Sequence, residues 1–320
     1  MGAKQHSLPA VYLGGFSDVL RPHRRESLLW VGRRGISAIF QKKAEGLCAM
    51  DDLYTLKRRP WMSSLKFNRY ELDAMWLPVE RRLASAIEAI ISCGECFDAQ
   101  TWLNTLVEFV AQTFVRGVDF GPRFVQRVVD LIPDEELRVK FKVTDSDNIN
   151  AVRLIELHRL RGAVRRGHWT IVHASPGRLI TNDLARTPIF STTEKFFGYL
   201  VPLRSDAALL LSFDATDHQP MSLYAHPEDR WIIGPIKHEA ATEARIAQLN
   251  GMLASSAIKE IYGAPKALVG DLHARMAIDS PPRDIVEPTL LAPFRDLGDS
   301  REFMRIVTRL ATPPSQYVDG

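Results

Sequence analysis

The first stretch that could carry chemistry is "GRLITNDLARTP", Gly177 to Pro188, in which a short apolar run is followed at once by Thr, Asn and Asp. Asp183 could be a general base or metal ligand, or it could form an Asx turn or cap the next segment. A buried carboxylate without partners shifts its pKa by roughly 3–5 units. If Asp183 is buried, it therefore needs a cation, a metal or several donors, and Arg116 and the amides after Ile180 are the candidates.

Two of the three cysteines form a Cys-x-x-Cys pair, "CGEC" at Cys93 to Cys96. Such a pair can be a redox couple or half of a zinc site. A redox pair normally opens a helix after a strand, whereas this one closes an apolar helical pattern, and no second pair completes four sulfur ligands. We therefore expect a helix C-terminus with Gly94 at its end.

Positive charge is concentrated in two segments, although the net charge is only +3. Residues 1–70 hold 13 Lys and Arg against 5 Asp and Glu, and residues 151–190 hold 7 Arg against 2 acidic residues. Folded onto one face, they would form a surface for nucleic acid or a phosphorylated ligand, with Arg153, Arg165 and Arg166 as binding residues. With acidic neighbours close in space, they would be ordinary solvated patches.

The composition is that of a globular protein, with 46% hydrophobic and 25% charged residues. A chain of 320 residues suits one large domain or two ordinary ones. No window approaches the ~18–20 consecutive apolar residues that span a bilayer, and the N-terminus lacks the apolar core of a signal peptide. The low, odd number of cysteines is typical of a reducing compartment. We therefore expect a cytoplasmic protein without a membrane partner.

Hydrophobic periodicity predicts short strands on both sides of a helical block at about 71–162. The first part has strands expected at 10–13, 28–31 and 36–40, the last two joined as a hairpin by "GRRG". Helices are expected at 70–92, 101–117, 121–132 and 148–161, with a kink or restart at Pro78.

The later strands are expected at 168–174, 177–183, 199–203, 207–213 and 230–234, and a helix from 243 to 263 follows. The apolar run at 207–211 suits a central strand buried on both faces. The predicted class is α+β, with one sheet built from N-terminal and late strands and covered by the helical block. Residues 1–265 would form a single mixed domain, and 266–320 an irregular C-terminal extension with one short helix at 301–310.

Several motifs, taken in order, resemble those of a known family. "HSLPAVYLGGF" matches a His-x-x-Pro-x-x-Tyr-Leu-x-x-Phe opening, and "MDDLYTL", "AQTFVRG", "VPLRSDAALLLSF" and "LNGMLASSAIKEIY" match later elements. "HWTIVHASPGRLITND" loosely matches a Trp strand leading to an apolar-Thr-Ser-Asp-x-Pro element, although Ala185 and Pro188 open out its end. From Lys4 to Tyr262 the chain thus resembles the bacterial proteins that contain domain of unknown function 4238, a family to which no activity is assigned.

The resemblance singles out polar residues from distant parts of the chain. A His with one or two carboxylates can bind a divalent metal such as Mg²⁺ or Mn²⁺, or can act as a general acid–base pair. An Arg provides a fixed cationic fork for phosphate. The first hypothesis is therefore a hydrolase or nuclease-like enzyme. In it Asp183 and His6 are ligands or bases, Glu80 lies in the same site, Arg116 is the transition-state clamp, Gln112 binds substrate, and Asp51 and Glu71 are further members.

The same residues allow a purely structural interpretation. Glu80 and Arg116 could be an ion pair between two helices, and His6 could bond a main-chain carbonyl. The second hypothesis is a non-catalytic module that binds nucleic acid or protein in a stress or defence system. A working site requires His6, Glu80, Arg116 and Asp183 to converge within roughly 10 Å in a concave pocket.

Overall fold

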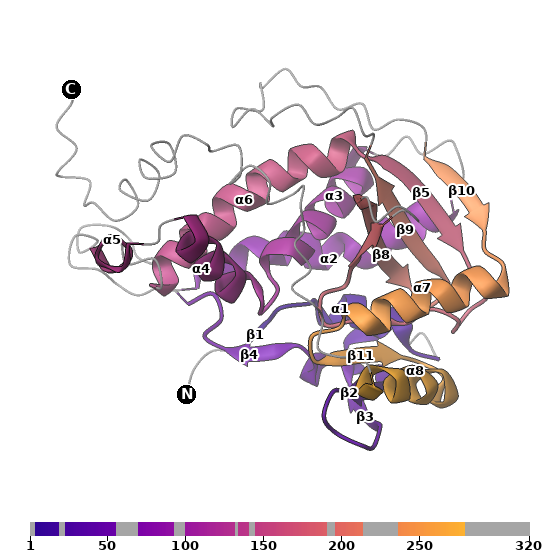
Figure 1. Cartoon of the computed structure of the whole chain (residues 1–320). Helices are drawn as coiled ribbons and strands as arrows, with labels where there is room; N and C mark the ends of the chain where they lie inside the picture. Colours follow the sequence, from indigo (N-terminus) through magenta and orange to yellow (C-terminus); the bar gives the residue numbers. More distant parts are fainter. Residues whose placement is uncertain are drawn as a thin grey trace.

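The computed structural model describes residues 4–18, 23–55, 70–92, 100–131, 134–140, 145–190, 196–213 and 236–278. Within these ranges a block of helices lies against one face of a five-stranded sheet, and helix α7 with a smaller sheet lies on its other side (Figure 1). The predicted α+β class is confirmed. The Cys93–Cys96 pair, the strand expected at 230–234 and the helix expected at 301–310 lie outside the described residues.

The predicted helical block is confirmed, and the apolar faces of its helices are buried against one another and against the sheet. The helix does not restart at Pro78 but continues through it, and the expected kink stays a prediction. Pro78 lies on the exposed side, where water can bind the carbonyl that loses its donor. The block consists of α2 (Glu71–Ser92), α3 (Gln100–Val115), α4 (Phe120–Leu131), α5 (Glu135–Lys140) and α6 (Ser146–Arg166).

The five-stranded sheet has the order β10-β5-β9-β8-β7 and is antiparallel except between β10 and β5. The predicted central strand is confirmed: in β9, Leu209 and Leu211 pack with the helical block, and Ala208 and Leu210 pack on the opposite side. This alternation follows from the two-residue period of a strand. The strands are β5 (His168–His173), β7 (Thr187–Phe190), β8 (Phe196–Arg204), β9 (Ala207–Ser212) and β10 (Lys237–Ala240).

A four-stranded sheet of order β3-β2-β11-β6 joins N-terminal and late strands, as predicted. The prediction of a single sheet is wrong, because the described strands form three. The chain turns sharply after the two-residue strand β6 and passes into the five-stranded sheet, and at this corner Ala185 has a φ of 54°. The strands are β2 (Leu28–Arg33), β3 (Phe40–Lys43), β6 (Thr181–Asn182) and β11 (Glu260–Gly263).

The predicted hairpin between β2 and β3 is confirmed, although its second strand begins later than expected, at Phe40. The tip of the connection contains Gly35, whose φ of 80° favours glycine. The two remaining strands, β4 (Ala49–Asp51) and β1 (Lys4–His6), pair in a separate two-stranded sheet.

The N-terminal segment folds back beside the Thr-Asn-Asp corner. Tyr12 donates to the carbonyl of Pro202 at 2.9 Å and shares a 2.8 Å hydrogen bond with the hydroxyl of Thr181. Tyr12 lies in helix α1 (Ala10–Leu13), so the strand expected there is wrong. The carbonyl of Pro9 accepts hydrogen bonds from the amides of Tyr12 and Leu13, which closes a helical turn.

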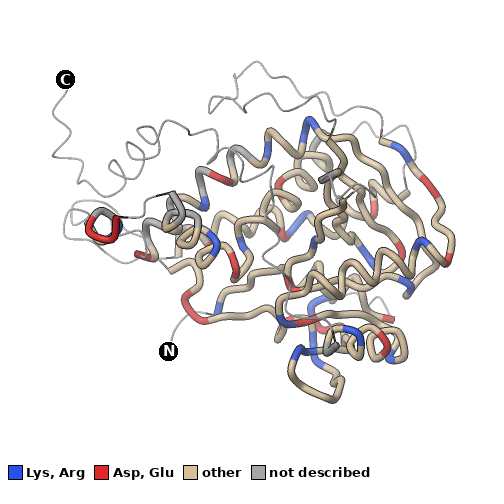
Figure 2. Tube along the Cα trace, viewed as in Figure 1, with Lys and Arg blue, Asp and Glu red and all other residues tan. Residues whose placement is uncertain are grey.

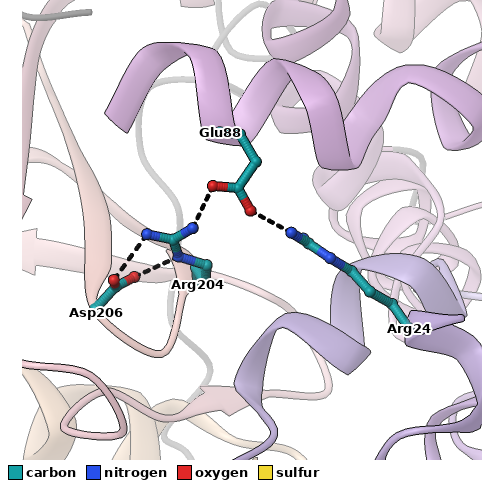
Figure 3. Close-up of polar contacts among 4 residues, drawn as sticks. All are labelled: Arg24, Glu88, Arg204 and Asp206. Carbon is teal, nitrogen blue, oxygen red and sulfur yellow. Dashed lines mark hydrogen bonds and ion pairs between the residues drawn. The ribbon is translucent and has the colours of Figure 1, made fainter. Parts of the chain in front are cut away.

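A network of ion pairs connects the N-terminal segment to α2 and to the five-stranded sheet (Figure 3). Glu88 of α2 pairs with both Arg24, in the 3-10 turn Arg24–Glu26, and Arg204 at the end of β8. Arg204 also donates to both carboxylate oxygens of Asp206, at 2.5 and 2.7 Å. Burial alone would raise the pKa of Glu88, but the hydrogen bonds and charges of the two arginines outweigh it and lower that pKa.

Helix α7 (Glu243–Ser256) is shorter than expected, because the chain leaves the helix and enters β11. The carboxylate of Asp183 accepts the amides of residues 258–260, which therefore cannot donate within a longer helix. Here a tertiary contact overrides the helical pattern of the sequence.

Residues 266–278 form a regular helix, α8 (Lys266–Ile278), in place of the irregular chain expected after residue 265. Val269 and Leu272 are buried in the apolar cluster shared with α7. A Cβ at Gly32 of β2 would lie 2.9 Å from the Cβ of His273, so the absence of a side chain lets α8 approach the sheet closely. The division of the chain at 265/266 stays a prediction.

Candidate functional site

Three of the predicted residues converge on the guanidinium of Arg116. Its Nη2 donates to Glu80 at 2.8 Å and to the main-chain carbonyl of His6 at 2.6 Å, and its Nη1 donates to the Gln112 side chain at 3.4 Å. The guanidinium also lies 5.3 Å from the ring centroid of Trp76. We call Arg116, Glu80, Gln112 and Trp76 the Arg116 cluster.

Only 2% of the Arg116 side chain is exposed, and 26% of the Glu80 side chain. Protein groups accept from both terminal nitrogens of Arg116, whereas its buried Nε has no partner among the described residues; the ion pair joins α2 to α3, as in the structural interpretation. The His6 imidazole does not join the cluster: its Nε2 lies 3.0 Å from the carbonyl oxygen of Glu45. His6 therefore contributes only its main chain to the position of Arg116.

Asp183 has partners other than the expected Arg116. One carboxylate oxygen accepts the amide of Ile258 at 3.0 Å, and the other accepts those of Lys259 at 2.6 Å and Glu260 at 3.3 Å. Burial raises the pKa of Asp183 to about 6, although these three donors favour the ionised form. The carboxyl group thus joins the corner to β11 and titrates near neutral pH.

The turn at this corner is closed by the residue before Asp183. The side-chain oxygen of Asn182 accepts the amides of Leu184 at 3.1 Å and Arg186 at 3.3 Å. Its amide nitrogen donates to the carbonyls of Arg186 and Leu253 and to the Ser256 hydroxyl. An Asx turn is therefore present in this stretch, but the side chain that closes it is that of Asn182 and not, as expected, that of Asp183.

Arg153 is buried and donates hydrogen bonds to main-chain carbonyls at the C-terminal end of α3. Its Nη1 donates to the carbonyl of Val115 and, at 3.5 Å, to that of Gly117, while Arg186 donates to the carbonyl of Thr113 at 2.8 Å. Two cations therefore lie at the negative end of the helix dipole. In this position Arg153 is not available as a surface phosphate contact.

The second basic segment does not form an uncompensated cationic surface in the described chain. Arg161 pairs with Glu108 at 2.5 Å, and Arg178 pairs with Glu243. Arg165 is half-buried, and burial lowers its pKa, whereas Arg166 is exposed at the end of α6. Figure 2 shows Lys and Arg positions interspersed with Asp and Glu positions along the chain. This supports the interpretation as solvated patches with acidic neighbours.

The described residues surround a cavity of about 360 Å³ between the two-stranded and four-stranded sheets. We call it the Cys48 cavity. Asp183 is the one predicted catalytic residue that lines it, and Ser7, next to His6, lies on the same wall. The remaining lining residues are Arg33, Lys42, Gly46, Leu47, Cys48, Ala49, Met50, Val118, Lys259, Glu260 and Tyr262.

A hydrogen-bonded chain crosses the Cys48 cavity. Tyr262 donates to Glu260 at 2.6 Å, and the thiol of Cys48 lies 3.1 Å from the Tyr262 hydroxyl, so the thiol is the donor between them. Glu260 also pairs with Arg33. Burial raises the pKa of Cys48 to about 12 and that of Tyr262 well above its usual value, so both groups are neutral at physiological pH.

Two lysines give the cavity its uncompensated charge. Lys42 and Lys259 are exposed, and no carboxylate among the described residues lies within ion-pairing distance of either ammonium group. The Lys42 stem passes over Gly46, where a Cβ would lie 2.9 Å from its Cε. The lysines are therefore free to contact an anion.

Backbone strain coincides with the cavity. Cys48 has a φ of 52° and Asp52 a φ of 55°, a region that residues other than glycine seldom occupy. Ala185, two residues after Asp183, has the same conformation. Such strained residues cluster at functional sites. No sequence pattern marked Cys48, Glu260 or Tyr262, because only the pairing of β11 with β2 brings them together with the 42–50 segment.

The other predicted site residues lie apart from the cavity. Asp51 ends β4 and is exposed, and the side chain of Glu71 lies outside the described residues. In the described part of the chain, no group of three His, Cys, Asp or Glu side chains could hold a metal ion. Mg²⁺ can also bind through one or two carboxylates completed by substrate phosphates and water, so the expected Mg²⁺ or Mn²⁺ stays a prediction. Nor is any described helix long and apolar enough to cross a membrane.

Fold and cavity together define a mixed α+β protein with a ligand-sized cavity between two sheets. Residues 4–267 match the family model described as "Protein of unknown function (DUF4238)". The chain belongs to this family, and the matched residues include every residue that lines the Cys48 cavity. No curated protein and no solved structure matches the chain.

Proposed function

We propose that the protein binds a phosphate-bearing ligand, a nucleotide or a segment of nucleic acid, in the Cys48 cavity. The observation that carries the proposal is a concave space of about 360 Å³, beside which two lysines have no ion-pair partner among the described residues. A cavity of this size is typical of small-molecule sites. Lys42 and Lys259 would contact the phosphate, and Leu47, Ala49 and Met50 would face the apolar part of the ligand.

The charge balance of the cavity supports an anionic ligand. Glu260 is neutralised by Arg33, which leaves Lys42 and Lys259 against the single carboxyl of Asp183. This ligand corresponds to the phosphorylated or nucleic-acid partner expected from the sequence, held at a different place. We further propose that the protein acts in the cytoplasm as a binding module of a bacterial stress or defence system.

The test is a binding measurement by calorimetry or fluorescence anisotropy. The probes are inorganic phosphate, nucleoside monophosphates, and single- and double-stranded DNA and RNA. Lys42→Met and Lys259→Met should each weaken binding about tenfold, because each removes a charged contact of about 1.5 kcal/mol. Lys43→Met is the matched control: Lys43 follows Lys42 on β3 and lies 3.8 Å from Glu45. Equal binding by all three variants, or no binding by the wild type, would refute the proposal.

A hydrolase is the second candidate, and a single observation favours it. Asp183 lines the cavity and has its pKa raised to about 6 by burial, close to the value that suits a general acid–base near neutral pH. The same DNA and RNA substrates should be incubated with Mg²⁺ or Mn²⁺ and with chelator. Asp183→Asn should abolish cleavage, and His6→Ala should leave it unchanged. Cleavage that survives Asp183→Asn would exclude this residue.

A further inference from the structure

Two histidines face each other at the edge of the five-stranded sheet, and neither of them lines the Cys48 cavity. His173 Nε2 lies 2.9 Å from His238 Nδ1, and the rings are stacked with centroids 5.2 Å apart. His173 ends β5, and His238 lies in the edge strand β10. At this distance one nitrogen carries a proton and the other accepts it, so the contact requires at least one neutral ring.

A second proton would turn this contact into a repulsion between two cations. Burial lowers the pKa of His173, and the proximity of His238 lowers it further. The other charged groups that act on His173 are Asp206, which favours the cation, and Arg204, which opposes it. Asp206 holds Arg204 with both oxygens and therefore offers little compensation. Lys237 and Glu239 flank His238 on β10, and both are exposed.

Strand β10 has few other attachments to the sheet. It is four residues long, β5 is its only partner among the described strands, and its side chains are exposed or half-buried. Beyond it the amide of Ala241 donates to the carbonyl of His173 at 2.8 Å, directly before the Thr242 cap of α7. Because β10 is short, its hydrogen bonds to β5 are few. Repulsion between two charged histidines within it would therefore oppose a large share of the interactions that attach it to the sheet.

We propose that the His173–His238 pair is a proton-operated latch, which holds β10 on the sheet while it shares one proton and releases it when both rings are protonated. Release exposes the main-chain donors and acceptors of β5 that β10 covers. The latch does not depend on the ligand proposed for the Cys48 cavity. Its failure would leave that proposal unaffected.

The sign of the pH effect follows from the lowered pKa. A histidine whose pKa is lower in the folded state stabilises the fold above its ordinary value of about 6.5, and this contribution is lost as the pH falls below it. The closed strand therefore loses stability relative to the open strand as the pH falls. We expect the protection of the β10 amides to be measurably lower at pH 5.5 than at pH 7.5.

Hydrogen–deuterium exchange of residues 237–241, corrected for the intrinsic pH dependence, measures this change. His173→Gln and His238→Gln keep a neutral donor and acceptor but cannot be protonated, so both should retain protection at pH 5.5. His168→Gln, at the other end of β5, is the matched control and should behave as the wild type. Protection that is independent of pH in the wild type, or a pH dependence that persists in both variants, would overturn the latch.

A titration of the histidine signals by NMR in the wild-type protein gives a test that needs no variant. The midpoint of His173 should lie below 6.5 and should coincide with the loss of protection. A midpoint that is separate from the opening of β10 would overturn the proposal even if the glutamine variants fail to fold.

Discussion

The Arg116 cluster and the Cys48 cavity both gather polar side chains from distant parts of the chain, but they differ in what satisfies those side chains. In the cluster, Arg116 is buried and has a carboxylate, a carbonyl and an aromatic ring as partners. In the cavity, Lys42 and Lys259 face open space beside a titratable carboxyl. Convergence alone therefore does not define a site. Unsatisfied groups next to an accessible volume do.

The N-terminal segment connects the cluster with the cavity, because two successive residues of this segment contact the two regions. His6 gives its carbonyl to Arg116, and Ser7, the next residue, lines the cavity. Successive residues of an extended segment point to opposite sides. The buried ion pair thus fixes the segment that forms one wall of the cavity.

The largest effect is expected from breaking the cluster. Arg116→Met should lower the free energy of unfolding by about 3–5 kcal/mol, because it leaves Glu80 and the carbonyl of His6 without their donor. Urea denaturation measures this. Arg166→Met, at an exposed position on α6, is the control and should change stability by less than about 0.5 kcal/mol. A loss below 1 kcal/mol in Arg116→Met would contradict a structural role for the cluster.

A pH-dependent effect of intermediate size is expected at Asp183, which belongs to the cavity. Because its pKa is raised to about 6, the folded protein binds a proton more tightly than the unfolded chain does. The contribution is fully present below the unfolded pKa of about 3.9 and is lost as the pH rises through about 6, a difference of about 3 kcal/mol. Asp183→Asn, which stays neutral like the protonated acid, should therefore gain about 2 kcal/mol of stability relative to the wild type between pH 4.5 and pH 7.5.

Chemical denaturation across this pH range checks the prediction, with Asp271→Asn, an exposed carboxylate on α8, as the control. A stability difference between wild type and Asp183→Asn that is constant with pH would show that the carboxyl of Asp183 is not desolvated.

The smallest effect is expected at Glu88, which links neither region directly but anchors the N-terminal segment (Figure 3). Glu88→Gln should cost about 1 kcal/mol, because the carboxylate is 41% exposed and its ion pairs are screened by salt. Its pKa is lowered, so its contribution exists above the ordinary value and is lost as the pH falls, the opposite sign to Asp183.

Denaturation in low and high salt separates this contribution, with Glu136→Gln, exposed on α5, as the control. A cost that is unchanged in 1 M salt would indicate that packing, and not charge, holds the Arg24–Glu88–Arg204 network together.

The sequence predicted the elements whose patterns are long and regular. The helical block and the doubly buried strand β9 follow from periodicities of 3.6 and 2 that extend over many residues. Short segments were less predictable: α1 was expected to be a strand and β11 the end of a helix. In both, a few hydrogen bonds that the carbonyl of Pro9 or the carboxylate of Asp183 accepts outweigh local propensity.

For the candidate site, the sequence predicted that His6, Glu80, Arg116 and Asp183 converge. The structure brings Glu80 and the carbonyl of His6 to Arg116, and it places Asp183 at the Cys48 cavity. The sequence could not indicate that Arg116 is enclosed and paired with Glu80 and the carbonyl of His6, since such pairing depends on depth of burial. It also gave no sign of Cys48, Glu260 or Tyr262, whose residue types are unremarkable until β11 aligns them.

By itself the sequence determined the α+β class, the helical block and the polar residues that the fold must place, because these depend on composition and on the order of residues within a few turns. Only the tertiary structure decided which of those polar residues are enclosed and which face a cavity. That outcome depends on contacts between segments more than 100 residues apart, such as Arg116 with His6, which no local pattern encodes. Partners for Arg116 and open space for Lys42 and Lys259 arise from the same packing of sheets and helices.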